Sequence, residues 1–129
     1  MAAVRKRRRR LGENPLRDVR AAIDISQKDL AEELGLARTT IISAEQVDPK
    51  PWLMLACVGL GCIRLSGDRV GQLSGPRLAQ LRSDLGLSAE QLANRLGFAA
   101  STISTWERSA PPLWAHPAMV GLAVSLIGP

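Results

Sequence analysis

The sequence predicts an all-α fold built from two tandem units. Apolar residues recur at spacings of three and four residues, and no segment alternates with a period of two, so the pattern indicates helices rather than strands. The chain also repeats itself at one constant offset, which aligns Ser26 with Ser88. With 129 residues, of which 46% are hydrophobic and 22% are charged, it can form one small domain or two very small ones. A large enzyme with a deep cleft is therefore not expected.

The repeat continues without a gap along most of each unit. Its shared residues include glycine, proline, tryptophan, threonine and glutamate, which two merely similar helices would not share in one register. We interpret the pattern as an internal duplication. The identical pairs are Leu16/Leu78, Arg20/Arg82, Ser26/Ser88, Leu30/Leu92, Ala31/Ala93, Leu34/Leu96, Gly35/Gly97, Ala37/Ala99, Thr40/Thr102, Ile41/Ile103, Glu45/Glu107, Pro49/Pro111, Trp52/Trp114, Ala56/Ala118, Val58/Val120, Gly59/Gly121 and Leu60/Leu122.

Capping signals divide each unit into short helices. In the second unit, Ser88 is followed three residues later by Gln91, which is the pattern of a capping box. Gly97 can adopt a positive φ and end that helix. Ser26 and Gly35 mark the corresponding helix of the first unit. Since another helix follows each glycine turn, the pattern predicts a helix-turn-helix in both units.

Composition sets the expected boundaries. A segment rich in glycine and polar residues separates the two units and is typical of a hinge. Units of about fifty residues are near the lower limit for an independent core. We therefore expect them to pack against each other or against a second copy, through the apolar segments Trp52–Ile63 and Trp114–Ile127. The predicted division is a disordered basic arm at 1–13, a first unit at 14–64, a linker at 65–75 and a second unit at 76–129.

The positive charge belongs to the N-terminal arm. Six of the 17 cations are Arg5, Lys6, Arg7, Arg8, Arg9 and Arg10, and without them 11 cations face 12 acidic residues, a net charge of −1. The arm is expected to contact DNA phosphates or to enter a narrow minor groove. The alternative is a solvated tail that aids solubility or binds RNA without specificity.

Several classes of site and location are not expected. The two cysteines, Cys57 and Cys62, lie in an apolar stretch and are predicted to be buried, reduced thiols of a cytoplasmic protein. With His116 as the single histidine there is no ligand set for zinc, and we expect no metal, cofactor or catalytic residue. The longest apolar run is about half of the ~20 residues that cross a membrane. The predicted location is the bacterial cytoplasm or nucleoid.

Two segments resemble the Cro/CI (XRE) helix-turn-helix family. They are GLSAEQLANRLGF at 86–98 followed by STISTWE at 101–107, and ISQKDLAEELGLARTTI at 25–41. Together the two resemblances extend over residues 16–122. They imply an all-α fold of two tandem four- to five-helix, lambda-repressor-like helix-turn-helix units. They also imply that double-stranded DNA is the partner, with the second helix of a motif in the major groove.

For the first unit, the resemblance places the recognition helix at about Arg38–Gln46. The implied base-contacting residues are Arg38, Thr39, Ile42 and Ser43, and the implied phosphate-contacting residues are Gln27 and Thr40. Arg38 is the strongest specificity candidate, because a guanidinium can donate to guanine O6 and N7 together, which discriminates between bases by roughly 1–3 kcal/mol.

The second unit departs from this pattern. The glutamine and arginine positions are occupied by Ala89 and Ala100. Either hydroxyl and methyl groups still contact thymine and adenine edges, or this unit has become an interaction and dimerisation module. The positions corresponding to the family's base contacts are Ala100, Ser101, Ser104 and Thr105, and those corresponding to its phosphate contacts are Ser88 and Thr102.

Four other conspicuous residues are expected to be structural. Trp52 and Trp114 occupy equivalent positions in apolar segments and are predicted in the core or an interface. Glu45 and Glu107 could suggest a catalytic carboxylate pair, but the duplication explains both of them. The family resemblance implies that this glutamate is structural.

The predicted function is that of a sequence-specific transcriptional regulator, a repressor of phage, plasmid or mobile-element type. Either the tandem units imitate a homodimer within one chain, or the chain dimerises through its second unit and binds a palindrome. A hypothesis of another class is a protein-binding module, such as an anti-activator or inhibitor. It would have kept the fold and would bind DNA only non-specifically through its arm.

Overall fold

The computed structural model describes residues 14–127. Within that range it contains eight α-helices and no strand, so the all-α prediction is confirmed. Proline or glycine begins several of these helices, and glycine or a turn ends them. The helices are α1 (Pro15–Ala22), α2 (Gln27–Leu34), α3 (Arg38–Gln46), α4 (Pro51–Leu65), α5 (Gly75–Asp84), α6 (Ala89–Leu96), α7 (Ala100–Arg108) and α8 (Ala115–Ile127).

The boundaries of the middle helices follow the repeat. Helices α2 and α6 are both 8 residues long and α3 and α7 are both 9, and the members of each pair begin at equivalent positions of the repeat. Ser26 caps α2, and Ser88 and Gln91 form the predicted capping box at α6. Gly35 and Gly97 end these helices at φ 71° and 88°, a conformation that glycine adopts without steric cost.

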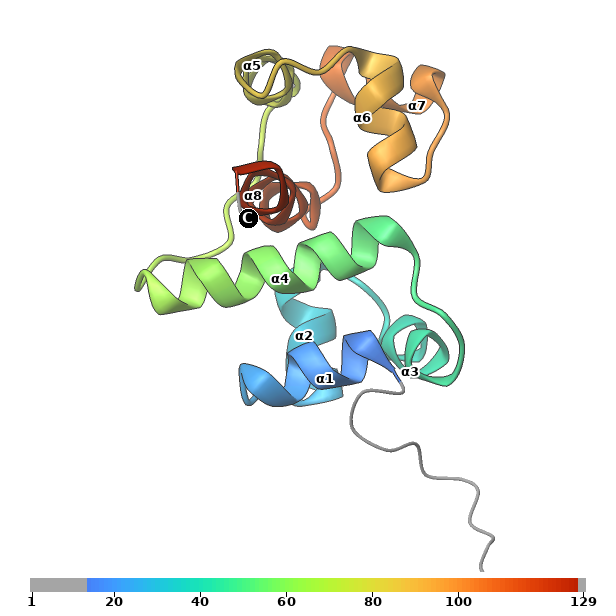
Figure 1. Ribbon diagram of the computed structural model, residues 1–129, viewed down its shortest axis with the longest axis vertical. Coiled ribbons are helices and arrows are strands. Elements are labelled where there is room, and N and C mark those ends of the chain that lie inside the picture. Colours follow the sequence, from blue (N-terminus) through green and yellow to red (C-terminus); the bar gives the residue numbers. More distant parts are fainter. Residues whose placement is uncertain (1–13, 128–129) are drawn as a thin grey trace, which may run out of the picture.

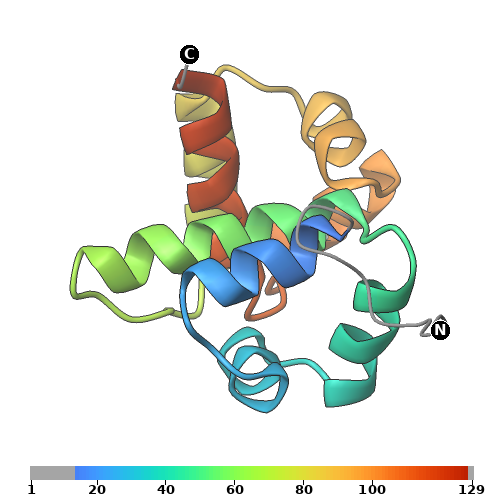
Figure 2. The same ribbon diagram turned by 60° about the horizontal axis from the view of Figure 1, so that its bottom comes forward.

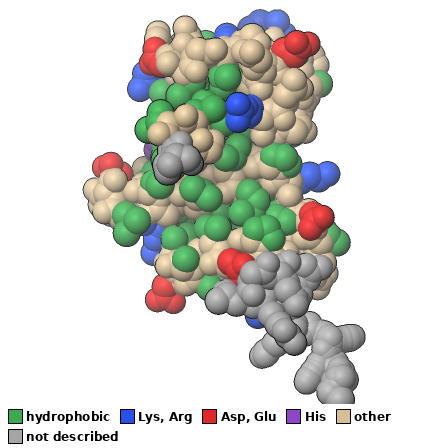
Figure 3. All heavy atoms as spheres, in the orientation of Figure 1, with side chains coloured by type: hydrophobic (Ala, Val, Ile, Leu, Met, Phe, Trp, Pro, Cys, Tyr) green, Lys and Arg blue, Asp and Glu red, His purple; other side chains and the backbone are tan. Residues whose placement is uncertain are grey.

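Two long apolar helices form the centre of the molecule. Helix α4 crosses α8, with α1, α2 and α3 on one side of the pair and α5, α6 and α7 on the other (Figures 1 and 2). The predicted apolar segments therefore pack against each other. Hydrophobic side chains are visible across the middle of the molecule, whereas charged side chains lie around its edges (Figure 3).

The crossing of α4 and α8 requires glycine on both helices. A Cβ atom on Gly59 would overlap the backbone carbonyl of Pro117, and a Cβ atom on Gly121 would overlap the carbonyl of Leu55. Both glycines are buried. Because neither has a side chain, the two helix backbones can approach far more closely than alanine would permit.

An aromatic cluster extends this contact. The rings of Trp52 and Trp114 lie 4.3 Å apart, and Phe98 stacks on Trp114 at 5.8 Å. Trp106 of α7 makes edge contacts with Phe98 and Trp114 at 5.2 and 5.5 Å. Trp114 is buried and Trp52 is half-buried, so both tryptophans lie where the two halves of the chain meet.

Hydrogen bonds hold the segment between α4 and α5 against residues at and just before the start of α8. The backbone N–H of Gly71 donates to Nδ1 of His116 at 2.9 Å, and Nε2 of Gln72 donates to the carbonyl of Pro111 at 2.7 Å. Burial lowers the pKa of His116, although the carboxylate of Asp68 opposes the shift. A neutral imidazole is required to accept the Gly71 hydrogen bond, so the lowered pKa preserves it.

The two cysteines of α4 differ in burial. Cys57 is a buried free thiol, and burial raises its pKa to about 12. Cys62 is half-buried, so the prediction that both thiols are buried is wrong for Cys62, which lies towards the end of α4. Among residues 14–127, no helix is long and apolar enough to cross a membrane, and no cluster of three potential metal ligands occurs.

Replacement of Gly59 at the crossing of α4 and α8 should destabilise the fold. We expect Gly59→Ala to lower the free energy of unfolding by at least about 1–3 kcal/mol, because a new methyl group must displace backbone atoms. Gly71→Ala is the matched control, since its Cβ would lie 4.0 Å from the nearest atom of His116. Urea denaturation of both variants measures the difference, and equal stabilities would contradict the close helix contact.

Candidate nucleic-acid interface

Helix α3 is held in place by a partly buried ion pair between Glu45 and Arg20 of α1. Arg20 Nε donates to Glu45 Oε2 at 2.5 Å, and Nη2 donates to Oε1 at 3.1 Å. Arg20 Nη1 also donates to the carbonyl of Ile25 at 3.1 Å. One guanidinium therefore joins the end of α3, helix α1 and the loop before α2, with the fixed planar geometry that a lysine could not supply.

The same contacts recur on the other side of the molecule. Arg82 donates to both carboxylate oxygens of Glu107, at 2.6 and 3.1 Å, and to the carbonyl of Leu87 at 3.0 Å. The hydrogen bond with Glu107 raises the pKa of Arg82, although burial opposes it. In the repeat, Arg82, Leu87 and Glu107 occupy the positions of Arg20, Ile25 and Glu45, so α7 is positioned by the same network as α3.

Asn14 is a positioning residue that the sequence analysis missed. Its Oδ1 accepts from the backbone N–H of Arg17 at 2.9 Å and caps α1. Its Nδ2 donates to the carbonyls of Ala44 and Val47, both at 3.2 Å. Asn14 thereby fixes the end of α3 to the start of α1. The available signal was an asparagine directly before Pro15, which is typical of a helix N-cap.

The exposed face of α3 contains the predicted contact residues. Ile41, Ala44 and Glu45 are buried, which turns the opposite side of the helix outward. On that side, Arg38, Thr39 and Ser43 are exposed, while Thr40 and Ile42 are half-buried.

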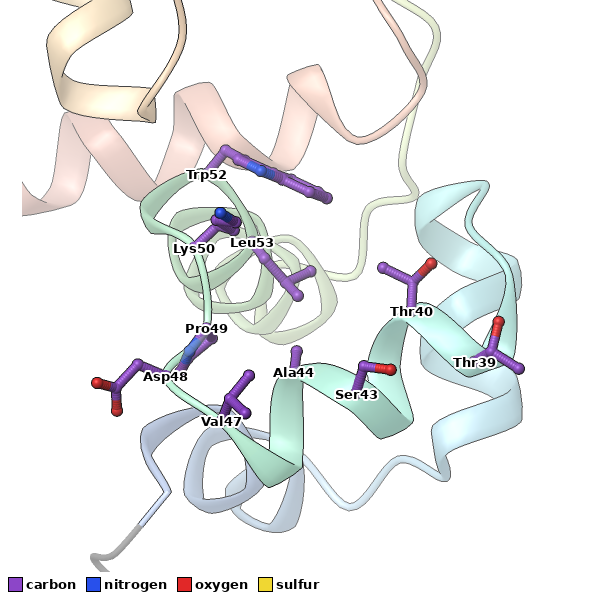
Figure 4. Close-up of a pocket in the computed structure, with 10 residues that line it drawn as sticks. All are labelled: Thr39, Thr40, Ser43, Ala44, Val47, Asp48, Pro49, Lys50, Trp52 and Leu53. Carbon is purple, nitrogen blue, oxygen red and sulfur yellow. The ribbon is translucent and has the colours of Figure 1, made fainter.

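A hollow of about 420 Å³ separates the exposed face of α3 from the start of α4 (Figure 4). Thr39, Thr40 and Ser43 line it from α3, and Lys50 and Trp52 line it from α4 and the residue before it. Lys50 is exposed and is a cation beside the predicted contact residues that the sequence analysis did not select. Only the tertiary structure shows that it lies near α3.

Gln27 is part of the network that holds α3. Its Nε2 donates to Glu45 Oε1 at 3.1 Å, and the residue is exposed only in part. The counterpart position is Ala89, which leaves Glu107 without this additional donor. Gln27 is thus placed to orient Glu45, and its predicted contact with a phosphate stays a prediction.

The early part of the exposed face of α7 carries hydroxyl groups and no charged side chain, unlike that of α3, which begins with Arg38. Ser101 and Thr105 are exposed, whereas Thr102 and Ser104 are half-buried. Ala100, at the start of the helix, is half-buried as well. The hydroxyl of Thr105 donates to the carbonyl of Ser101 at 2.9 Å, so its donor is already used.

Ser88 has a structural contact of its own. Its hydroxyl oxygen caps α6 by accepting from the backbone N–H of Gln91 at 3.1 Å. The side chain of Gln91 accepts in return from the backbone N–H of Ser88 at 2.8 Å. A phosphate contact at Ser88 would therefore have to coexist with the capping box, and it stays a prediction.

Arg108 is a further residue that sequence reasoning missed. It is exposed at the end of α7 and lies seven residues after Ser101 and three after Thr105, so the three share one face. The positions predicted from the sequence all lie before Trp106 in this helix. A strong hydrogen-bond donor is therefore present on the exposed face of α7.

On the face shown in Figure 3, positive and negative side chains are mixed. In the view of Figure 3, Lys and Arg side chains are scattered and alternate with Asp and Glu. The predicted phosphate contacts Arg5, Lys6, Arg7, Arg8, Arg9 and Arg10 lie outside the described residues.

Comparison with known families matches the C-terminal half. The family model for a helix-turn-helix domain matches residues 75–125, from the start of α5 to near the end of α8. Residues 75–125 are therefore similar to a helix-turn-helix domain. Comparisons with curated proteins and with solved structures give no match. Within the matched segment, α6 and α7 are joined by a turn at Gly97, as in a helix-turn-helix motif.

Removal of the ion pair that holds α3 should have a large effect. We expect Glu45→Ala to lower the free energy of unfolding by up to roughly 3 kcal/mol, because the partly exposed Arg20 guanidinium would lose its buried partner. Glu33→Ala breaks the exposed pair with Arg64 at 3.6 Å and should cost at most about 1 kcal/mol. Thermal or urea denaturation measures both, and similar losses would show that the Arg20–Glu45 pair is not a structural contact.

Proposed function

We propose that the chain is a sequence-specific, double-stranded DNA-binding regulator of the Cro/CI (XRE) type, with two tandem helix-turn-helix units at 14–64 and 76–129. The observation that supports it is the recurrence around α3 of the network that holds α7. The Arg20–Glu45 and Arg82–Glu107 pairs have the same geometry, and α3 has the length of α7. Residues 14–64 would thus present α3 as the matched domain presents α7.

The first turn of α3 is suited to an anionic partner. Arg38 is the first residue of this helix, and no side chain caps its backbone N–H groups. A cation at a helix N-terminus opposes the helix dipole and costs roughly 0.3–1 kcal/mol. A phosphate or an electronegative base edge would relieve this cost, because both attract the positive end of the helix and the guanidinium.

The proposed roles follow from exposure. Arg38 donates to a guanine edge, and Thr39, Ile42 and Ser43 contact neighbouring bases in the major groove. Thr40 and Lys50, across the hollow from each other, contact phosphates and set the position of α3 along the duplex. In the second unit, Ala100, Ser101, Ser104 and Thr105 contact bases weakly, Ser88 and Thr102 contact phosphates, and Arg108 is the strongest donor.

The biological role we propose is repression in a phage, plasmid or other mobile element, including repression of the chain's own gene. A bound repressor at a promoter needs no catalytic group, and control would come from protein concentration or from a partner.

The Arg38 guanidinium should determine specificity at one base. A DNase footprint on the DNA upstream of the gene, at physiological salt with competitor DNA, is expected to show protection in two successive major grooves. Arg38→Ala should weaken binding to that site about tenfold and relax specificity at one position. Arg69→Ala, an exposed arginine between α4 and α5, is the matched control. Equal losses on specific and random DNA would mean that Arg38 contacts only phosphate.

The N-terminal arm should determine how steeply the affinity for DNA falls with salt concentration. If all six cations between residues 5 and 10 contact phosphates, deletion of residues 2–10 should reduce the slope of log K against log salt by about 5. Fluorescence anisotropy across a salt series measures the slope, and an unchanged slope would exclude this role.

A protein-binding module is the second candidate function. The observation that favours it is an apolar hollow of about 320 Å³ between α5 and α8, lined by Leu81, Leu85, Met119 and Val120 among others. Salt-sensitive binding that is blind to sequence and depends wholly on the arm would favour this function over a specific regulator.

A further inference from the structure

The contact between α4 and α8 is reciprocal. Gly59 approaches the carbonyl of Pro117, and Gly121 approaches the carbonyl of Leu55. In the register of the repeat, Gly121 is the counterpart of Gly59, and Pro117 is the counterpart of Leu55. Exchanging the two halves of the chain therefore exchanges each contact for the other. That relation defines an isologous interface, in which the same patch on two copies meets itself about a two-fold axis.

Other contacts obey the same relation. Trp52 and Trp114 are counterparts in the repeat, and their ring centroids lie 4.3 Å apart. Two more pairs of counterparts on α4 and α8 are fully buried. They are Ala56 with Ala118 and Leu60 with Leu122. The interface that two separate copies of one unit would form is therefore present within a single chain.

This arrangement leaves the central faces of α4 and α8 covered by each other. A second chain could reach them only if the internal contact opened, which would expose the buried alanines and leucines to water. An intramolecular contact thus takes the place of dimerisation through this face. Forming it does not cost the translational freedom that two separate chains would lose on association.

The two exposed helices lie on one side of the molecule. Figures 1 and 2 differ by a rotation about the horizontal axis, and in both views α3 and α7 lie towards the right, on opposite sides of the α4–α8 pair. A duplex that contacts both helices would have to run along that side. A chain of 129 residues thereby presents two recognition helices without a partner.

The two helices are not chemically equivalent. The exposed residues Arg38 and Thr39 of α3 correspond to Ala100 and Ser101 of α7, and Arg108 at the end of α7 corresponds to Gln46. The strongest donor therefore lies at the start of one helix and at the end of the other. Identical half-sites would not suit both helices, since each would place its guanidinium over a different base.

We propose that a single chain binds an asymmetric operator of two unequal half-sites, one under α3 and the other under α7. This proposal rests on the proposed function, because it specifies the DNA that the same surface would recognise. A palindrome is the natural site of a symmetric dimer. A single chain whose two exposed helices differ is instead expected to bind two different half-sites.

Selection from random DNA tests the proposal directly. The probe is a duplex pool whose random region of about 30 base pairs accommodates two half-sites one helical turn apart. We expect enrichment of two unlike sequence blocks. Sedimentation equilibrium should give one 13.9 kDa chain per selected duplex and a monomer in the absence of DNA.

Two variants should affect different blocks. Arg38→Ala is expected to remove the base preference in one block and weaken binding about tenfold, whereas Arg108→Ala should affect only the other block. Arg69→Ala should change neither block. Circular dichroism of all three variants shows whether they remain folded, which is expected since each substituted side chain is exposed.

The outcomes separate the proposal from the function on which it rests. An inverted repeat bound by two chains, or a stable dimer without DNA, would overturn the asymmetric operator and leave sequence-specific binding intact. Two unlike blocks that both respond to Arg38→Ala alone would also overturn it, because α7 would then recognise nothing. A pool without any enriched sequence would overturn both the operator and the proposed function.

Discussion

The close approach of α4 and α8 at Gly59 and Gly121 is the contact around which the other helices are arranged. The two glycines allow the backbones to meet, and the meeting brings together Trp52, Trp114 and the apolar sides of both helices. Each half of the chain is close to the lower size limit for an independent core. The shared layer supplies the buried area that neither half possesses alone.

The Arg–Glu pairs transmit this arrangement to the exposed helices. Helix α1 packs on α4, and Arg20 of α1 and Asn14 before it both hold α3, so the orientation of α3 depends on the central layer through α1. Arg82 and Glu107 connect α5 with α7 in the same way. Rigid placement matters for the proposed contacts with DNA, because a guanidinium distinguishes bases only when its geometry is fixed before contact.

The two halves have diverged where they face the exterior. Their supporting ion pairs and central glycines are alike, but the exposed helix faces differ, and α1 packs against α4 while α5 leaves an apolar hollow beside α8. A Cβ atom on Gly61 would lie 3.0 Å from the side chain of Ile23, the residue after α1, whereas the counterpart positions are occupied by Ala123 and Leu85. Ala123 lines the hollow between α5 and α8.

The all-α class, the repeat and the caps at Ser26 and Ser88 could be predicted from the amino-acid sequence, because they depend on local periodicity and on residues a few positions apart. The contact positions of α3 were implied by the family resemblance. The sequence could not reveal that Arg20 meets Glu45 or that Asn14 holds the end of α3, since those partners lie 25 to 33 residues away. The place of Lys50 beside α3 likewise depends on how α4 packs. Whether α4 would pack on α8 or on another chain emerged only from the three-dimensional arrangement, because the carbonyls that face Gly59 and Gly121 belong to distant segments of the chain.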